Sequence, residues 1–144
     1  MKTTVLVLML LLSATIYAQK WVRYGMFAGS IVLNGVGDGM NDAKINKVFA
    51  HGLKAASVGM LLVTPLIDKD KPKALPYIST FILLRYAVFD ASYNLARGLP
   101  YDYTGSTSVH DKSLASIPKS IVTGSRMISL GLSIYINRKT KKTT

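Results

Sequence analysis

The chain has 144 residues, enough for one domain, and contains no cysteine, which excludes a disulfide framework and a thiolate metal site. Eighteen lysines and arginines against seven acids give a formal charge of +11, while 49% of the residues are hydrophobic. The bases cluster at positions 68–73 and 138–142, each beside an apolar run, which is typical of membrane proteins and argues against nucleic-acid binding.

The first 18 residues have the pattern of an export signal. A basic Met1-Lys2 start precedes the apolar run Val5–Leu12, and Ala18 suits the position before a cleavage site. We expect residues 1–18 to be a signal peptide, with an uncleaved first membrane helix as the alternative. Both forms would place Gln19 outside the cytoplasm.

The next segment, Trp21–Gly35, is predicted to be helical but is short of the length that crosses a membrane. We therefore expect a shorter interfacial or re-entrant helix at the outer surface. The glycine-rich run at 34–39 is predicted to be the turn that ends it, with Asn41 or Asp42 capping the helix that follows.

Three further segments are predicted to be helices of about 20 residues, the length of a membrane span. Their apolar parts are 48–67, which Pro65 bends or ends, 76–98, which begins near Pro76, and 118–137. The expected fold is all-α: a membrane domain at 19–137 with three transmembrane helices and one shorter helix, followed by a basic cytoplasmic tail at 138–144.

Charge bias gives an orientation for this arrangement. If 21–35 does not cross, the basic loop 68–73 and the tail lie in the cytoplasm, as the positive-inside rule favours. The GDGMND segment at 37–42 and the connection at 98–116 then share the outer face. We expect a bacterial envelope protein of the inner membrane.

Small residues recur four positions apart in the apolar segments. The pairs are Gly25/Gly29, Gly52/Ala56, Ala55/Gly59, Ala87/Ala91 and Ser125/Ser129. In lipid, this spacing lets helices approach closely. The pattern predicts a compact bundle.

The segment Val36–Ala43, VGDGMNDA, resembles the GDGxND motif of haloacid-dehalogenase-type phosphatases and P-type ATPases. The resemblance implies that carboxylates hold Mg²⁺ at a phosphoryl-transfer site. That family also needs an aspartate nucleophile in a DxDxT-type motif on a strand, which this chain lacks, so we interpret the match as coincidental. A weak divalent-cation site at Asp38 and Asp42 is an alternative.

The most informative stretch is 81–97, FILLRYAVFDASYNLAR, because charged residues lie within a long apolar run. At helical spacing, Asp90 lies on a polar arc that we expect to face the bundle. Asp90 is the one acid of the four apolar cores, so we predict that it pairs with Lys54 or Arg126, and that Asn94 and the tyrosines complete its hydrogen bonds. The predicted polar cluster comprises Lys54, Arg85, Asp90, Tyr93, Asn94, Arg97 and Arg126.

The outer loops supply a second set of candidates: Asp38, Asp42, Tyr101, Tyr103, Ser106, His110 and Asp111. The adjacent His110 and Asp111 do not define a catalytic triad, and the two histidines lack a metal-binding spacing. As a whole, this region, with its YN-x-x-RG-x-P turn and Gly-Ser-Thr-Ser loop, resembles uncharacterised small membrane proteins of bacteria and their phages. The resemblance implies membrane residence and adds nothing about mechanism.

Together these patterns predict a non-enzymatic binding or interaction module in a membrane, without cofactor or metal. Its expected partners are the lipid bilayer and a second copy or another membrane protein. The alternatives are a secreted soluble helical protein of the envelope and a Mg²⁺-dependent phosphoryl-transfer enzyme that uses the GDGMND loop.

Overall fold

A computed structural model describes residues 2–67, 74–104 and 113–140, with side chains from Lys20 onward. These ranges are helical and contain no strand, which confirms the all-α prediction. The long helices are α1 (Lys2–Asp42), α2 (Lys47–Ile67), α3 (Ala74–Ala96) and α5 (Lys119–Lys139), with one short helical turn at 113–115.

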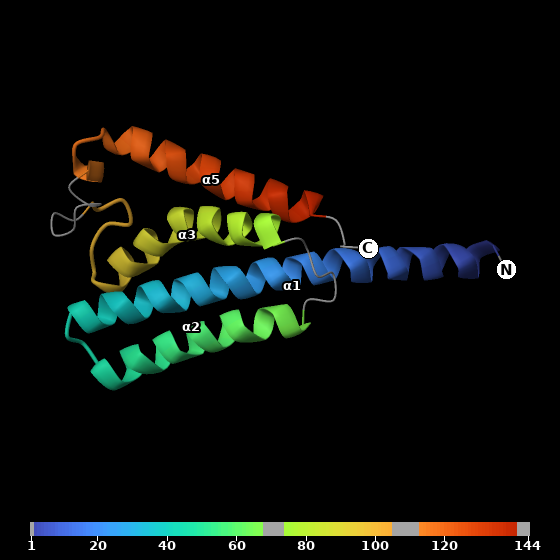
Figure 1. The fold of residues 1–144 in the computed structure, drawn as a ribbon, viewed down its shortest axis with the longest axis horizontal. Helices are drawn as coiled ribbons and strands as arrows, with labels where there is room; N and C mark the ends of the chain where they lie inside the picture. Colours follow the sequence, from blue (N-terminus) through green and yellow to red (C-terminus); the bar gives the residue numbers. More distant parts are fainter. Residues whose placement is uncertain (1, 68–73, 105–112, 141–144) are drawn as a thin grey trace.

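Helix α1 is the central element of the bundle (Figure 1). It packs against α2 on one side and α3 on the other, while α5 packs mainly on α3. Successive long helices run in opposite directions, and the N-terminal part of α1 extends beyond the bundle. The predicted short interfacial or re-entrant helix is therefore wrong, because 21–35 is an inner part of a 41-residue helix that lies beside α2 and α3.

The glycine-rich run does not form the predicted turn but continues α1. A Cβ atom on Gly39 would lie 2.4 Å from the backbone oxygen of Tyr93 in α3, and one on Gly35 would lie 2.9 Å from that of Phe89. On the other side of α1, a Cβ on Gly37 would lie 2.9 Å from the Ala50 oxygen of α2. These glycines serve close helix packing, and contacts with two neighbouring helices override their low helix propensity.

The turn between α1 and α2 lies several residues later than predicted. Lys44 adopts a left-handed conformation with φ 56°. Asn46 then caps α2, because its side-chain oxygen accepts a hydrogen bond from the Phe49 backbone N–H at 3.0 Å. The predicted caps Asn41 and Asp42 instead belong to the last turn of α1.

The other helix ends follow the prediction closely. Pro65 lies within the last turn of α2, and Pro118 directly precedes α5. Helix α3 ends in a Schellman motif: the Leu99 N–H donates to the Asn94 carbonyl at 2.9 Å, and Gly98 has φ +71°. Glycine at this position avoids the cost of a left-handed conformation.

The core contains a small apolar cluster at the centre of the bundle. Phe27 and Ile31 of α1 are buried there against Leu84 of α3, and the Phe27 ring packs edge-to-face on Tyr77 and Phe81. Most other buried side chains are polar: Arg23, Ser30, Ser57, Thr64, Thr80, Ser92, Asn94, Arg126, Ser133, Asn137 and Thr140. The interior is thus rich in hydroxyl, amide and guanidinium groups.

Large apolar side chains point outward instead. They include Val58, Leu62 and Leu66 of α2, Leu75, Ile78 and Ile82 of α3, and Ile121, Ile128 and Leu132 of α5. Among the described residues, two stretches are long and apolar enough to cross a membrane, Lys47–Leu66 and Ala74–Ala96. The sequence predicted a third span at 118–137, but α5, which covers this segment, does not meet the same measure of length and composition.

Candidate functional site

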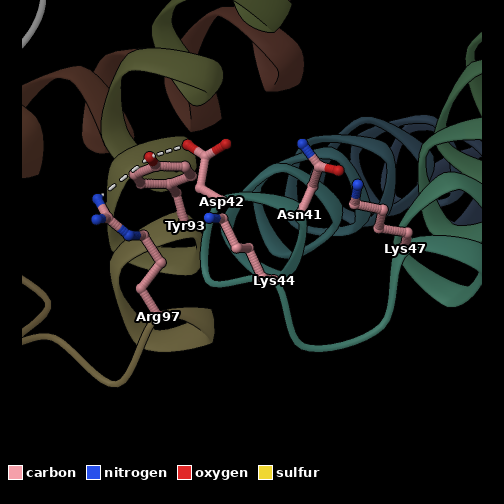
Figure 2. Close-up of a pocket in the computed structure, with 6 residues that line it drawn as sticks. All are labelled: Asn41, Asp42, Lys44, Lys47, Tyr93 and Arg97. Atoms are coloured by element: carbon pink, nitrogen blue, oxygen red, sulfur yellow. Dashed lines mark hydrogen bonds between the residues drawn. The ribbon is translucent and has the colours of Figure 1, made fainter.

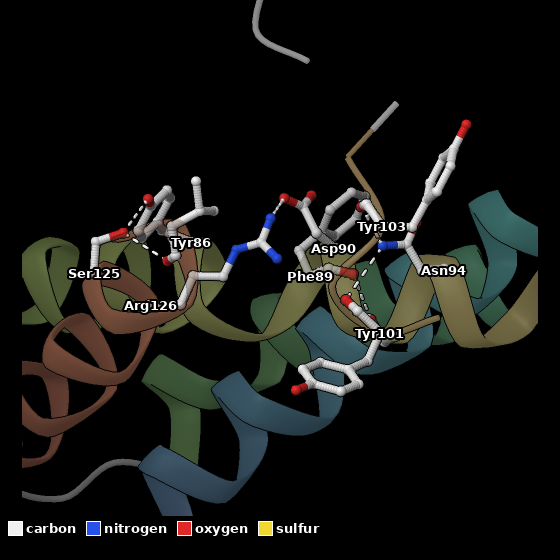
Figure 3. Close-up of polar contacts among 10 residues, drawn as sticks. Tyr86, Phe89, Asp90, Asn94, Tyr101, Tyr103, Ser125 and Arg126 are labelled. Carbon is white, nitrogen blue, oxygen red and sulfur yellow. Dashed lines mark hydrogen bonds and ion pairs between the residues drawn. The ribbon is translucent and has the colours of Figure 1, made fainter. Parts of the chain in front are cut away.

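An ion pair joins α3 to α5 (Figure 3). The Arg126 guanidinium donates to an Asp90 carboxylate oxygen, so of the two predicted bases Arg126 is the partner of Asp90. Arg126 is 8% exposed, and its Nε has no hydrogen-bond partner among the described residues. The Tyr86 and Ser125 hydroxyls, 2.8 Å apart, add a second polar contact between the same helices.

The polar side chains of α3 do not all face one helix. Tyr86 and Asp90 contact α5, whereas Tyr93 contacts Asp42 of α1. Leu84 of α3 is buried against Phe27 and Ile31 of α1. Arg85 also belongs to α3, but its guanidinium lies 4.2 Å from the centre of the Phe89 ring, a cation–π contact within the helix.

Lys54 lies elsewhere, at the contact of α1 with α2. Its ammonium is 2.7 Å from the Asp38 carboxylate, and both side chains are partly exposed. The close approach of Gly37 to the Lys54 side chain brings the two helices together there. Lys54 is therefore separate from the Asp90 pair with which the sequence grouped it.

Asn94 also differs from its predicted role as a hydrogen-bond partner of Asp90. Its amide nitrogen donates to the Tyr103 carbonyl at 2.7 Å and to the Tyr101 carbonyl at 3.3 Å (Figure 3). The two tyrosine side chains are themselves exposed, at 58% for Tyr101 and 38% for Tyr103. The buried Asn94 thus anchors the chain that leaves α3.

Replacing Asn94 by alanine is expected to destabilise the protein by about 2 kcal/mol, because two carbonyls lose a buried donor. Thermal unfolding followed by circular dichroism measures this loss. Ser116→Ala, which removes a hydrogen bond from an exposed side chain, is the control and should change stability little. Equal melting temperatures for Asn94→Ala and wild type would contradict the anchoring role.

A second polar cluster lies at the end of the bundle where α1 and α3 end (Figure 2). The Tyr93 hydroxyl donates to the Asp42 carboxylate, and Arg97 donates to the same hydroxyl at 3.2 Å. The Arg97 guanidinium also lies over the Tyr93 ring, 5.3 Å from its centre. The GDGMND segment and the end of α3 thus share one end of the molecule.

A third polar cluster, which the sequence did not predict, joins α1 to the end of α5 at the opposite end of the bundle. Arg23 is 2% exposed and donates twice to the Asn137 side-chain oxygen, at 2.8 and 3.1 Å. Asn137 donates to the Lys20 carbonyl, and the Lys20 ammonium donates to the Arg138 carbonyl at 3.0 Å. The available signal was helical spacing, since Arg23, Phe27 and Ile31 fall on one face of α1.

The remaining acidic candidates form separate polar contacts in the described part of the chain. Asp38 pairs with Lys54 and Asp42 with Tyr93, and no group of three acidic or histidine side chains gathers among the described residues. Ser106, His110 and Asp111 lie outside the described residues. The GDGMND segment is the helical end of α1.

Comparisons of the chain with protein-family models, with curated proteins and with solved structures found no match.

Proposed function

We propose that this chain is a small integral membrane protein whose helix bundle acts as a non-enzymatic interaction module. One observation carries the proposal: the bundle has polar side chains inside and large apolar side chains outside. Leu66 is 82% exposed and Leu62 is 68% exposed, whereas Thr64, on the other face of α2, is fully buried. In water this distribution opposes the hydrophobic effect, whereas in hydrocarbon it is favourable.

Helix length supports the proposal. At 1.5 Å per residue, the 21 residues of α2 and the 23 of α3 span about 32 and 35 Å, close to the hydrocarbon thickness of about 30 Å. Helices α1 and α5 lie alongside and would cross with them. Their buried arginines, Arg23 and Arg126, face other helices, as ionisable groups in a membrane usually do.

The polar contacts support a structural role for the buried polar side chains. Ser30 with Ser57, Tyr24 with Ser133, and Asp90 with Arg126 each join two different helices. Interhelical hydrogen bonds of this kind fix the register of helices in lipid. We propose the lipid bilayer as the surrounding partner, and a second copy or another membrane protein as the partner of the outward apolar faces.

Extraction of membranes with alkaline carbonate tests membrane residence. We expect the full chain to remain in the pellet and to dissolve only in detergent, because its outward apolar side chains contact lipid. A peripheral membrane protein in the same sample should be released and serves as the control. Recovery in the carbonate supernatant would contradict the proposal and favour the alternative, a secreted soluble protein of the envelope.

A further inference from the structure

A basic pocket lies at the end of the bundle where the α1–α2 turn meets the end of α3 (Figure 2). Its volume is about 450 Å³. The lining residues are Asn41, Asp42, Lys44, Lys47, Tyr93 and Arg97. They come from three parts of the chain: the end of α1 with its turn, the start of α2, and the end of α3.

The charges that line the pocket are unbalanced. Lys44, Lys47 and Arg97 line the pocket together with a single carboxylate, that of Asp42, which already accepts a hydrogen bond from Tyr93. None of the three bases forms an ion pair with an acid among the described residues. Three cations gathered around one cavity repel one another, and an anion placed between them would relieve this repulsion.

The backbone of the turn that lines the pocket is held in place. The turn that carries Lys44 is closed by two hydrogen bonds, from the Lys44 N–H to the Asn41 carbonyl and from the Ile45 N–H to the Met40 carbonyl, both at 3.1 Å. Gly39 packs directly on the backbone of Tyr93, so the turn is fixed beside the end of α3. The pocket is therefore part of the α1–α3 contact.

We propose that this pocket binds a phosphate group. A phosphate offers several oxygen acceptors to the ammonium and guanidinium donors that line the pocket from the α1–α2 turn, the start of α2 and the end of α3. Two sources share this chemistry: the phosphodiester of an anionic lipid and free phosphate. The lipid source rests on the proposed membrane function, because a pocket at the end of a membrane bundle lies at the depth of the headgroups. The pocket itself does not depend on that function.

The test compares the full chain with the double variant Lys44→Gln/Lys47→Gln. Titration calorimetry with inorganic phosphate, on protein in neutral detergent, should show binding about 30-fold weaker in the variant, roughly fivefold for each exposed lysine that pairs with the anion. The control Arg138→Gln/Lys139→Gln removes the same charge from exposed residues at the opposite end and should bind as wild type does. Circular dichroism should show that both variants remain folded, since all four side chains are exposed.

Nanodiscs of phosphatidylcholine with and without phosphatidylglycerol then identify the source. Retention of phosphatidylglycerol by wild type, lost in the Lys44→Gln/Lys47→Gln variant, supports an anionic lipid as the ligand. Phosphate binding without preference for phosphatidylglycerol supports a free phosphate group. The proposal is overturned if wild type binds neither probe, or if the pocket variant and the control variant bind equally. Carbonate extraction is independent of these results, so failure of the pocket and failure of membrane residence are distinguishable.

Discussion

Alanine at both Gly35 and Gly39 is expected to destabilise the bundle by about 4 kcal/mol. A Cβ at Gly39 would lie 2.4 Å from a backbone oxygen of α3, which cannot rotate away, so α1 and α3 must separate. Overpacking of this kind costs about 3 kcal/mol at each position. The better helix propensity of alanine offsets about 1 kcal/mol of this cost at each position, which leaves about 2 kcal/mol per substitution. Unfolding in detergent, followed by circular dichroism, measures the difference.

Gly25→Ala is the matched control, because Gly25 lies on the same helix and a Cβ there meets nothing within 4 Å. This variant should be neutral or more stable by up to about 1 kcal/mol. If Gly35→Ala/Gly39→Ala and Gly25→Ala both melt with wild type, the close contact of α1 with α3 is wrong.

Asp90→Leu is expected to destabilise the protein by about 3 kcal/mol, because it leaves the nearly buried Arg126 charge without its carboxylate. The double variant Asp90→Leu/Arg126→Met removes both charges and should regain most of this loss. A double-mutant cycle that also includes Arg126→Met therefore isolates the energy of the pair. Melting temperatures and chemical unfolding of the four proteins supply the measurements.

The exposed pair of Lys119 with Asp102 provides the comparison. Their charged atoms lie 3.8 Å apart and the Lys119 side chain is 64% exposed, so Asp102→Asn should cost at most about 0.5 kcal/mol.

An Asp90→Asn variant that inserts and melts like wild type would contradict a stabilising role for the ion pair of Asp90 with Arg126.

The all-α fold class and three of the four long helices could be predicted, because the sequence features that mark them are local. Pro118 and Gly98 mark ends through backbone geometry that any neighbouring structure would leave unchanged. The course of α1 could not be predicted in this way. Glycines such as Gly39 favour a turn when considered alone, and only the nearby backbone of α3 gives them a reason to be helical.

The same distinction applies to the small residues four apart. Gly25, Gly52 and Gly59 have the spacing of close-packing residues, but a Cβ on any of them would meet nothing within 4 Å. A four-residue spacing identifies a helix face with small side chains, but it does not show whether another helix packs on that face. A Cβ on Gly29 would lie 2.9 Å from the Met60 Cε of α2, so this member of a predicted pair does face a neighbour. The close contacts with the backbone of α3 are made by Gly35 and Gly39, which have the same spacing but lie in the run assigned to the turn.

Part of the candidate site could be predicted because the apolar segments contain few ionisable residues. Asp90 is an acid in an apolar segment with few bases available, and Arg126 is one of the two bases that the sequence offered. Helical spacing places Arg23 on the same face as Phe27 and Ile31, but its contact with Asn137 could not be predicted, because it depends on α1 lying within the bundle. A helix at 21–35 that lay at the membrane surface, as predicted, would not bring Arg23 beside Asn137.

The contacts of Lys20 with Arg138 and of Arg23 with Asn137 bring the beginning and the end of the bundle to the same side of any membrane that it crosses. An export signal cut after Ala18 would place Gln19 outside the cytoplasm and the basic tail with it. The positive-inside rule would instead retain both ends in the cytoplasm. The two sorting signals thus compete for a single orientation of the molecule, and a reporter fused after Thr144 reads the compartment of both ends at once.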